Sequence, residues 1–290
     1  MNHNFPKVSV IIPVYNHERY VEDAILSVLE QDYQNIELIV INDGSTDNSS
    51  EKIIELSERC TFKYINQKNQ GLSQTLLNGL ALSTGEYFAI VASDDQWLKH
   101  KLTVQIEHML AHSDTVACCA LVNIIDEHNN VTLRKPGEKV ERYDFCKIMM
   151  KGFNIPPATI LINKKVLSND CFDPTLKVED LYLWLKITES GGYVDVLPDV
   201  LANYRIHSTN TTGNLSLIAK YHHIIIDRFR NYAMYRNAKS RWCRFSFRQL
   251  TRNYKKESLK YLYPDISFYG SIDFAIGIIK LIFVWPSKNG

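Results

Sequence analysis

The loop after the first expected strand contains no glycine. It reads Pro-Val-Tyr-Asn-His-Glu over residues 13–18. A dinucleotide-binding fold needs Gly-x-Gly-x-x-Gly at this point so that the backbone can approach a pyrophosphate, and a Walker loop needs its own glycines and lysine. Neither pattern occurs in the chain. A bound diphosphate would therefore have to be neutralised by other groups.

Paired cysteines and a secretion signal are also missing. No Cys-x-x-Cys spacing occurs among the six cysteines, which argues against a zinc site or a disulfide framework (Cys60, Cys118, Cys119, Cys146, Cys171 and Cys243). Residues 1–7 are polar and lack the apolar core of a signal peptide. We therefore expect the protein to work in a reducing, cytoplasmic compartment.

Net charge is almost absent as well, but the charges are unevenly divided. The formal net charge is +1. From Asn214 onward the chain has 14 Lys and Arg and 4 Asp and Glu, a net charge of +10. The residues before Asn214 have 19 Lys and Arg and 28 Asp and Glu, a net charge of −9. This asymmetry predicts a larger domain over residues 1–213 and a basic, aromatic-rich helical extension over residues 214–290.

The basic extension is expected to meet an anionic surface. No nucleic-acid-binding motif accompanies its cations and aromatics, so nucleic acid is not the expected partner. Residues 272–285 are strongly apolar but carry Asp273, Gly277 and Lys280 on one helical face. This pattern favours a helix lying in a membrane interface, at the cytosolic face of the inner or plasma membrane. The alternative is that these helices pack on the larger domain or on another subunit.

Short apolar runs alternate with amphipathic segments through the larger domain. Strands are expected at residues 8–12, 36–41, 62–65, 87–91, 116–125, 158–162, 194–196 and 201–204, with Pro13 ending the first. Helices are expected at residues 21–29, 48–56, 72–82 and 102–110, and from about residue 179. This alternation predicts an α/β fold with a doubly wound, mostly parallel sheet flanked by helices.

Two adjacent carboxylates, Asp94 and Asp95, follow the apolar run 87–92. In open α/β sheets a ligand binds beyond the carboxyl ends of the strands. Two neighbouring anions repel unless a cation lies beside them, and a hard divalent cation binds carboxylates and phosphates together. The pair therefore predicts a metal that also holds a phosphorylated ligand. A solvated turn with two helix-capping acids is the alternative interpretation.

Other candidate residues follow from their positions along the chain. Asp43 ends the second expected strand, where it could accept hydrogen bonds from a base or ribose, and Tyr15 offers a flat face for stacking. Glu179 and Asp180 begin a helix that is apolar around most of its circumference. Favourable placement in the positive field of the helix N-terminus is one reason for these acids. Proton transfer is the other.

Several motifs together resemble those of family-2 inverting glycosyltransferases, which have the nucleotide-sugar-binding GT-A fold. The resemblance covers roughly residues 7–208, and the Asn-Asp-Gly-Ser-Thr-Asp block is its most specific part. Its motifs are Pro-Val-Tyr-Asn at 13–16, Val-Ile-Asn-Asp-Gly-Ser-Thr-Asp at 40–47, Asn-Gln-Gly at 69–71, Gly-Glu-Tyr at 85–87, Ser-Asp-Asp at 93–95, Glu-Asp at 179–180 and Tyr-Arg-x-His at 204–207.

The resemblance implies a role for each matched residue. The residues that it implies bind the nucleotide sugar are Pro13, Tyr15, Asn16, Asp43, Asp94 and Arg205, with Arg205 near the phosphates. Asp95 is then the more direct metal ligand and His207 completes the metal shell, where imidazole suits Mn²⁺ better than Mg²⁺. Asp180 would be the catalytic base, with Glu179 as the fallback.

Two departures from the family pattern stand out. The acid that often precedes the pair by two places is Ala92 here, and an Asn expected in the 72–82 helix is replaced by Leu77, with Asn78 next to it. We expect an inverting transferase that uses Mn²⁺ or Mg²⁺ and moves a sugar from a nucleoside-diphosphate donor, a UDP-sugar first of all. The expected acceptor is a glycan or lipid-linked hydroxyl in surface polysaccharide biosynthesis. A catalytically silent nucleotide-sugar-binding or scaffold protein is the alternative.

Overall fold

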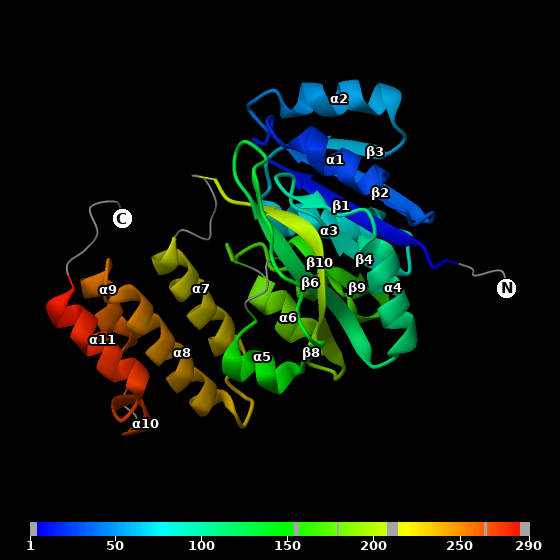
Figure 1. The fold of residues 1–290 in the computed structure, drawn as a ribbon. Helices are drawn as coiled ribbons and strands as arrows, with labels where there is room; N and C mark the ends of the chain where they lie inside the picture. Colours follow the sequence, from blue (N-terminus) through cyan, green and yellow to red (C-terminus); the bar gives the residue numbers. More distant parts are fainter. Residues whose placement is uncertain (1–4, 154–156, 179, 208–213, 264–265, 285–290) are drawn as a thin grey trace. The chain divides into compact units, whose positions relative to one another are not determined.

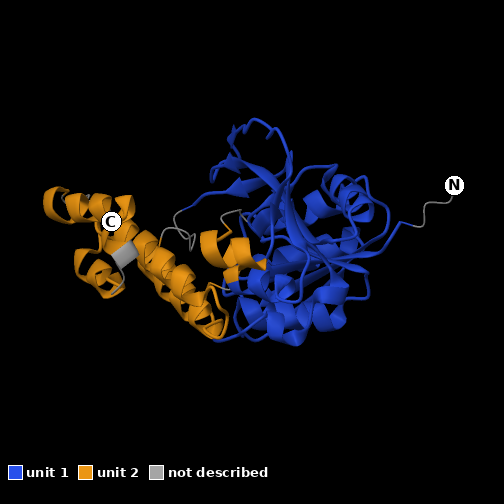
Figure 2. Ribbon diagram, turned by 90° about the horizontal axis from the view of Figure 1, so that it is seen from below, with its two compact units in different colours: residues 1–144, 154–175, 182–208 blue, residues 145–153, 176–181, 209–290 orange. Residues whose placement is uncertain are grey.

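The computed structural model describes residues 5–153, 157–178, 180–207, 214–263 and 266–284. Two compact units make up the chain (Figure 2). Unit 1 comprises residues 1–144, 154–175 and 182–208, and unit 2 comprises residues 145–153, 176–181 and 209–290. Unit 2 thus combines the basic extension with two short segments from earlier in the chain.

Unit 1 is built on a mixed sheet of ten strands whose order is β3-β2-β1-β4-β9-β6-β10-β5, with β7 beside β6 and β8 beside β10 (Figure 1). The strands are β1 (Val8–Val14), β2 (Ile36–Asp43), β3 (Lys63–Gln67), β4 (Tyr87–Ile90), β5 (Gln96–Trp97), β6 (Thr115–Ile125), β7 (Val131–Thr132), β8 (Glu141–Tyr143), β9 (Leu161–Asn163) and β10 (Tyr193–Arg205). Strands β3, β2, β1 and β4 are parallel, as are β6 and β10, while β9 and β5 pair antiparallel to their neighbours.

Helices pack on both faces of this sheet. They are α1 (Val21–Leu29), α2 (Ser49–Arg59), α3 (Leu72–Leu82), α4 (Lys101–Ala111) and α6 (Asp180–Thr188), of which α6 begins in unit 2. Alternate β1 residues such as Val10 and Ile12 join one core with α1, α2 and α4. Ile11 points the other way, against Gly79 of α3, where an added Cβ would lie 2.8 Å from Ile11 Cγ2. The continuous burial of β1 from Val8 to Ile12 therefore follows from a sheet covered on both sides.

The first strand does not stop at Pro13, as the sequence predicts, but continues through it to Val14. Val91 N donates to Ile11 O, so the backbone N–H and C=O of Ile11 point toward β4. Because this direction repeats every two residues along a strand, the backbone of Pro13 faces the same side. Strand β4 has ended at Ile90 by that level. The missing N–H of Pro13 therefore costs no ladder bond, because no strand faces it there.

Unit 2 is helical. Its helices are α5 (Phe145–Lys151), α7 (Leu215–Arg228), α8 (Tyr235–Leu250), α9 (Lys255–Ser258), α10 (Ile266–Tyr269) and α11 (Ile272–Phe283). Helix α8 is central, because α5, α7 and α11 all pack against it (Figure 1). Trp242 of α8 donates its Nε1–H to Met149 O at 2.9 Å, which ties α5 to the extension. Phe247 and Phe268 form the centre of a small apolar core.

Candidate active site

The carboxyl ends of β1, β4 and β10 carry the polar side chains of the candidate site. Strand β1 runs into the 15–20 loop, β4 runs into Ser93-Asp94-Asp95, and β10 ends at Arg205, two residues before His207. In Figure 1 these three strands lie within one sheet, flanked by α1. The site thus lies where open α/β sheets bind ligands.

Three of these side chains form a cluster with ligand atoms for a metal ion. Candidate ligand atoms of His17, Asp94 and His207 all lie within 4.8 Å of one another. His207 Nε2 is 2.9 Å from Asp94 Oδ2, and the His17 and His207 rings meet edge to face with centroids 5.8 Å apart. From the sequence, His207 was expected to be a metal ligand and Asp94 to bind the nucleotide sugar, while His17 had no assigned role.

Asp95 is not part of this cluster. Its side chain is buried, Oδ1 accepts a hydrogen bond from Arg205 N at 2.9 Å, and Oδ2 has no hydrogen-bond partner among the described residues. Burial and the neighbouring charge of Asp94 raise the pKa of Asp95 well above its usual range. An unsatisfied buried carboxylate oxygen calls for a proton or a cation. The assignment of Asp95 as a metal ligand remains a prediction.

Arg205 is 0% exposed and contacts several residues of the site. Its Nε donates to Asp94 O at 2.8 Å and its Nη1 donates to Asp126 O at 2.7 Å. The guanidinium carbon lies 4.5 Å from the centre of the Tyr20 ring, on which His207 also stacks with centroids 5.4 Å apart. Arg205 therefore positions Asp94 through its backbone. Because the side chain is buried, direct contact with a diphosphate, as predicted from the sequence, would require a movement that exposes the guanidinium.

The donor set of the cluster fits a divalent metal ion. Burial lowers the pKa of His17, although the Asp94 charge opposes that effect, so the ring is neutral near pH 7 and can offer a nitrogen lone pair. Ligands of Mn²⁺-sized or smaller ions lie about 2.0–2.2 Å from the metal, hence at most ~4.4 Å from each other. The spread of 4.8 Å thus needs only a small closing movement of the side chains.

Asp43 lies at the end of β2, as expected, but its carboxylate is engaged. Oδ1 accepts from Gln67 Nε2 and from Gln70 N, both at 2.8 Å, and Oδ2 accepts from Gly71 N at 2.9 Å. Gln67 Oε1 in turn accepts from Asn78 Nδ2 at 2.8 Å. Asp43 thus holds the loop before α3 in place, and Asn78 is tied to it through Gln67. Its predicted contact with a nucleoside would use remaining acceptor capacity on these oxygens.

The loop after β1 presents an exposed aromatic ring. Tyr15 is 47% exposed, as a stacking face for a base requires. Asn16, at φ 55°, is held by the 44–48 segment: its backbone N–H donates to Ser45 Oγ, and its Oδ1 accepts from Thr46 N. Pro13 precedes this loop within β1. All three residues stay candidates for nucleotide binding.

Asp180 is the first residue of α6. Burial raises its pKa, although the N–H of Leu181, which donates to Oδ1 at 2.8 Å, opposes the shift. Desolvation therefore outweighs the hydrogen bonds at the helix start, and this direction suits a general base better than an ordinary Asp pKa does. Glu179, the fallback, lies outside the described residues.

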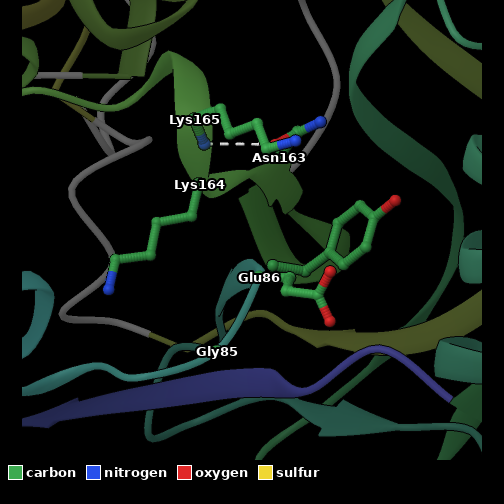
Figure 3. A pocket seen from close by; sticks show the side chains of 6 residues that line it. Gly85, Glu86, Asn163, Lys164 and Lys165 are labelled. Carbon is green, nitrogen blue, oxygen red and sulfur yellow. Dashed lines mark hydrogen bonds between the residues drawn. The ribbon is translucent and has the colours of Figure 1, made fainter. Parts of the chain in front are cut away.

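A separate hollow of about 290 Å³ lies at the other end of β4. Figure 3 shows its lining, with Glu86 just before β4 on one side and Asn163 to Lys165, at and after the end of β9, on the other. Lys164 Nζ is already bonded to Ser83 O at 2.5 Å. The hollow is remote from Asp94 along the strand, so it is not the candidate site.

Sequence reasoning missed His17, Tyr20 and Gln67. His17 was visible as part of the glycine-free loop, and the rule that parallel strands end at one edge could have placed it near Asp94. Tyr20 belongs to no recognisable sequence motif. Its role depends on stacking with His207 and Arg205, which are brought to it only by the fold.

Comparisons with known proteins agree with this fold. The family described as Glycosyl transferase family 2 matches residues 9–171. An uncharacterized glycosyltransferase of Rickettsia typhi is 32% identical over 215 residues, covering 72% of this chain and 66% of that protein. An Escherichia coli protein named UDP-Glc:alpha-D-GlcNAc-diphosphoundecaprenol beta-1,3-glucosyltransferase WfgD is 28% identical, covering 71% and 80%.

Solved structures share the fold at low sequence identity. S. aureus TarS in complex with UDP-GlcNAc superposes with a TM-score of 0.66 at 19% identity, covering 84% of this chain and 73% of that one. The Pyrobaculum calidifontis mannosyltransferase PcManGT, in complex with GDP-Man and Mn²⁺, gives 0.65 at 14% identity, covering 96% and 87%.

The sheet and its flanking helices therefore have the fold of GT-A glycosyltransferases. The chain belongs to glycosyl transferase family 2. It spans about two thirds of the length of the Rickettsia typhi relative.

Proposed function

We propose that the protein is an inverting, divalent-metal-dependent glycosyltransferase. It moves a hexosyl group from a nucleoside-diphosphate donor, a UDP-sugar first of all, to a hydroxyl of a glycan or lipid-linked acceptor in surface polysaccharide biosynthesis. The observation that carries the proposal is the cluster of His17, Asp94 and His207 at the carboxyl edge of the sheet. The acceptor class is supported by the WfgD relative, whose name specifies a lipid-linked substrate.

A bound Mn²⁺ or Mg²⁺ would supply positive charge to the departing diphosphate. Asp94 and His207 are the residues proposed to hold it, with Asp95 as a further candidate, and Arg205 keeps Asp94 in position. The Mn²⁺ in the PcManGT complex supports the same choice. The absence of a glycine-lined phosphate loop favours it too, because the chain offers no helix start of that type for the diphosphate.

Asp180 is the proposed base. In an inverting transfer the acceptor oxygen bonds to the anomeric carbon while the bond from that carbon to the diphosphate breaks, and the hydroxyl proton goes to the carboxylate. A raised pKa makes Asp180 a stronger proton acceptor than an ordinary Asp. Tyr15, Asp43, Asn16 and Pro13 are proposed to bind the nucleoside.

A donor screen tests the function as a whole. Purified protein is incubated with Mn²⁺ and a panel of sugar nucleotides, and the released nucleoside diphosphate is measured. We expect slow release from one donor class even without an acceptor, and Asp180→Asn should keep donor binding while its transfer rate falls by about 10²- to 10⁴-fold. Donor binding without release from any donor would favour the silent-protein alternative. Normal transfer by Asp180→Asn would remove this residue from the mechanism.

The helical extension is the proposed membrane-facing part of the protein. Within the described residues no helix is long and apolar enough to cross a bilayer. The sequence places Asp273, Gly277 and Lys280 on one face of α11, but this face does not form a solvent-facing polar stripe. Gly277 is buried against Phe247 of α8, and Asp273 pairs with Arg248 at 2.6 Å.

The opposite face of α11 is apolar and exposed. It carries Ile272, Ala275, Ile279 and Ile282 at helical spacing, followed by Phe283. Exposed apolar surface of this extent marks an interaction site. We propose an anionic lipid surface as its occupant, because α8, on which α11 packs, and the turn that follows it expose arginines (Arg241, Arg248 and Arg252). Cations flanking an apolar helix face are typical of interfacial helices.

Vesicle sedimentation tests this proposal. Ile279→Asp with Ile282→Asp should abolish binding to vesicles that contain anionic lipid. Leu110→Asp on α4 is the matched control, because Leu110 is 62% exposed and Ile282 is 61% exposed, and it should bind like the parent protein. Unchanged vesicle binding with an altered oligomeric state would instead assign the face to a second copy of the chain.

A further inference from the structure

His17 is held in place by two other segments of the chain. Its backbone N–H donates to Ser49 Oγ at 3.0 Å, and its Nδ1 lies 2.7 Å from Ser93 Oγ. Ser93 directly precedes Asp94, so the segment that carries the acid also orients the imidazole. The ring packs edge to face against both Tyr20 and His207, with centroids 6.1 and 5.8 Å away.

The hydrogen bond to Ser93 leaves the other ring nitrogen available. Nε2 of His17 has no hydrogen bond within the part of the chain that the structure describes. When Nδ1 carries the proton and donates it to Ser93 Oγ, Nε2 keeps its lone pair. This is the arrangement of metal-bound histidines, in which the second ring nitrogen donates to a neighbouring oxygen and thereby fixes the ring.

We propose that His17 is a third ligand of the divalent metal, together with Asp94 and His207. This inference rests on the proposed metal dependence and adds a residue from a different loop to it. The resulting set of two imidazole nitrogens and one carboxylate oxygen differs from an all-oxygen site. Imidazole ligands favour Mn²⁺, Co²⁺ or Zn²⁺ over Mg²⁺ and Ca²⁺, which prefer oxygen. His17 thus makes the site selective for transition metals.

The competing explanation is that His17 only supports the loop that contains Ser93. That role would affect folding and activity, but it would not change the number of nitrogens bound to the metal. A readout of the metal itself therefore separates the two roles. Electron spin echo modulation of Mn²⁺ bound to the full chain counts coordinated imidazoles directly. We expect two in the parent protein and one in His17→Gln.

Affinity gives a second measurement. Titration calorimetry without a donor should show that His17→Gln weakens Mn²⁺ binding by at least ~10-fold while Mg²⁺ binding changes much less. His128→Gln, an exposed histidine on the 126–130 turn, should bind Mn²⁺ like the parent protein. Ser93→Ala, which removes only the hydrogen bond that orients the ring, should weaken binding less than His17→Gln.

The outcomes separate this inference from the proposed function. One coordinated imidazole in the parent protein, or Mn²⁺ affinity lost in Asp94→Asn and His207→Gln but kept in His17→Gln, would overturn the role of His17 and leave metal dependence standing. A parent protein that binds no Mn²⁺, with or without a sugar nucleotide, would overturn both. Circular dichroism of each variant shows whether it is folded, and the imidazole count in the parent protein does not depend on any variant.

Discussion

Lys101 is a buried cation whose replacement gives a quantitative test of the core. It is the first residue of α4, is 0% exposed, and its Nζ has no hydrogen-bond partner among the described residues. The charge is partly stabilised by a cation–π contact with the Trp97 ring, whose centroid lies 3.7 Å from Nζ. Burial lowers the pKa of Lys101 to about 7, only weakly opposed by the neighbouring thiols of Cys118 and Cys119.

The size of the effect follows from this pKa. The unfolded chain protonates the amine below pH 10.5 and the folded chain only below about pH 7. Between these values unfolding takes up a proton, so the free energy of unfolding rises with pH. A shift of about 3.5 pKa units corresponds to about 5 kcal/mol over the whole window, of which about 3 kcal/mol falls between pH 6.5 and 9.5.

Lys101→Met removes the charge and keeps most of the volume. We expect the variant to be at least as stable as the parent at pH 6.5, with an advantage that shrinks by about 3 kcal/mol by pH 9.5. Urea unfolding at both pH values measures this difference. Lys99→Met, at an exposed position two residues earlier, should leave the pH dependence unchanged. A destabilised Lys101→Met at pH 6.5, or an advantage that does not vary with pH, would refute the reasoning.

Two further predictions concern buried charges. Arg205→Met should leave the carbonyl oxygens of Asp94 and Asp126 without their donor, which lowers the free energy of unfolding by about 3–5 kcal/mol. The melting temperature should then fall by about 6–20 °C. A change of under 2 °C would contradict the positioning role. Burial raises the pKa of Asp195, but hydrogen bonds, first of all from Arg142, outweigh it and lower the pKa below 3.8. Its stabilisation is therefore present above that value and lost as the pH falls through the folded-state pKa, so Asp195→Asn should flatten the acid limb of a stability–pH profile.

The sequence predicted most elements because apolar periodicity records burial directly. Helix α3 matches the expected range at both ends, Leu72–Leu82. The two strands expected at 194–196 and 201–204 are one strand, β10, in which the pairing with β6 shifts register between Leu197 and Val200. Pro198 lies at that irregularity, and its missing N–H explains why the pattern looked like two strands.

Two interpretations failed for a common reason. Pro13 was expected to end β1, and Asp273, Gly277 and Lys280 were expected to form a polar stripe along the helix that is now α11. In each case the outcome depends on a neighbour distant in sequence: β4 stops short beside Pro13, and Phe247 of α8 covers Gly277. The sequence pattern shows which local structure a residue prefers. The structure at these two positions depends instead on the neighbouring strand or helix, which the pattern does not show.

The candidate site was predictable to the extent that its residues belong to motifs. Asp94 and His207 meet at 2.9 Å although 113 residues separate them, as the shared carboxyl edge of the sheet requires. The buried state of Arg205 and the engaged carboxylate of Asp43 could not be foreseen, because both depend on loops whose backbone groups face inward.

The glycine-free loop and the missing acid at position 92 have one physical explanation under the proposed site. A glycine-lined helix start would bring backbone N–H groups to a diphosphate, but here the loop brings the His17 ring to Asp94 instead. Ala92 leaves the site with two acids, and the charge of buried Arg205 opposes part of their repulsion by acting to lower the pKa of Asp95. A third carboxylate would add repulsion that only the metal could relieve. Neutral imidazoles complete the coordination without that repulsion, so the fold can keep Asp94, Asp95 and Arg205 together before any metal binds.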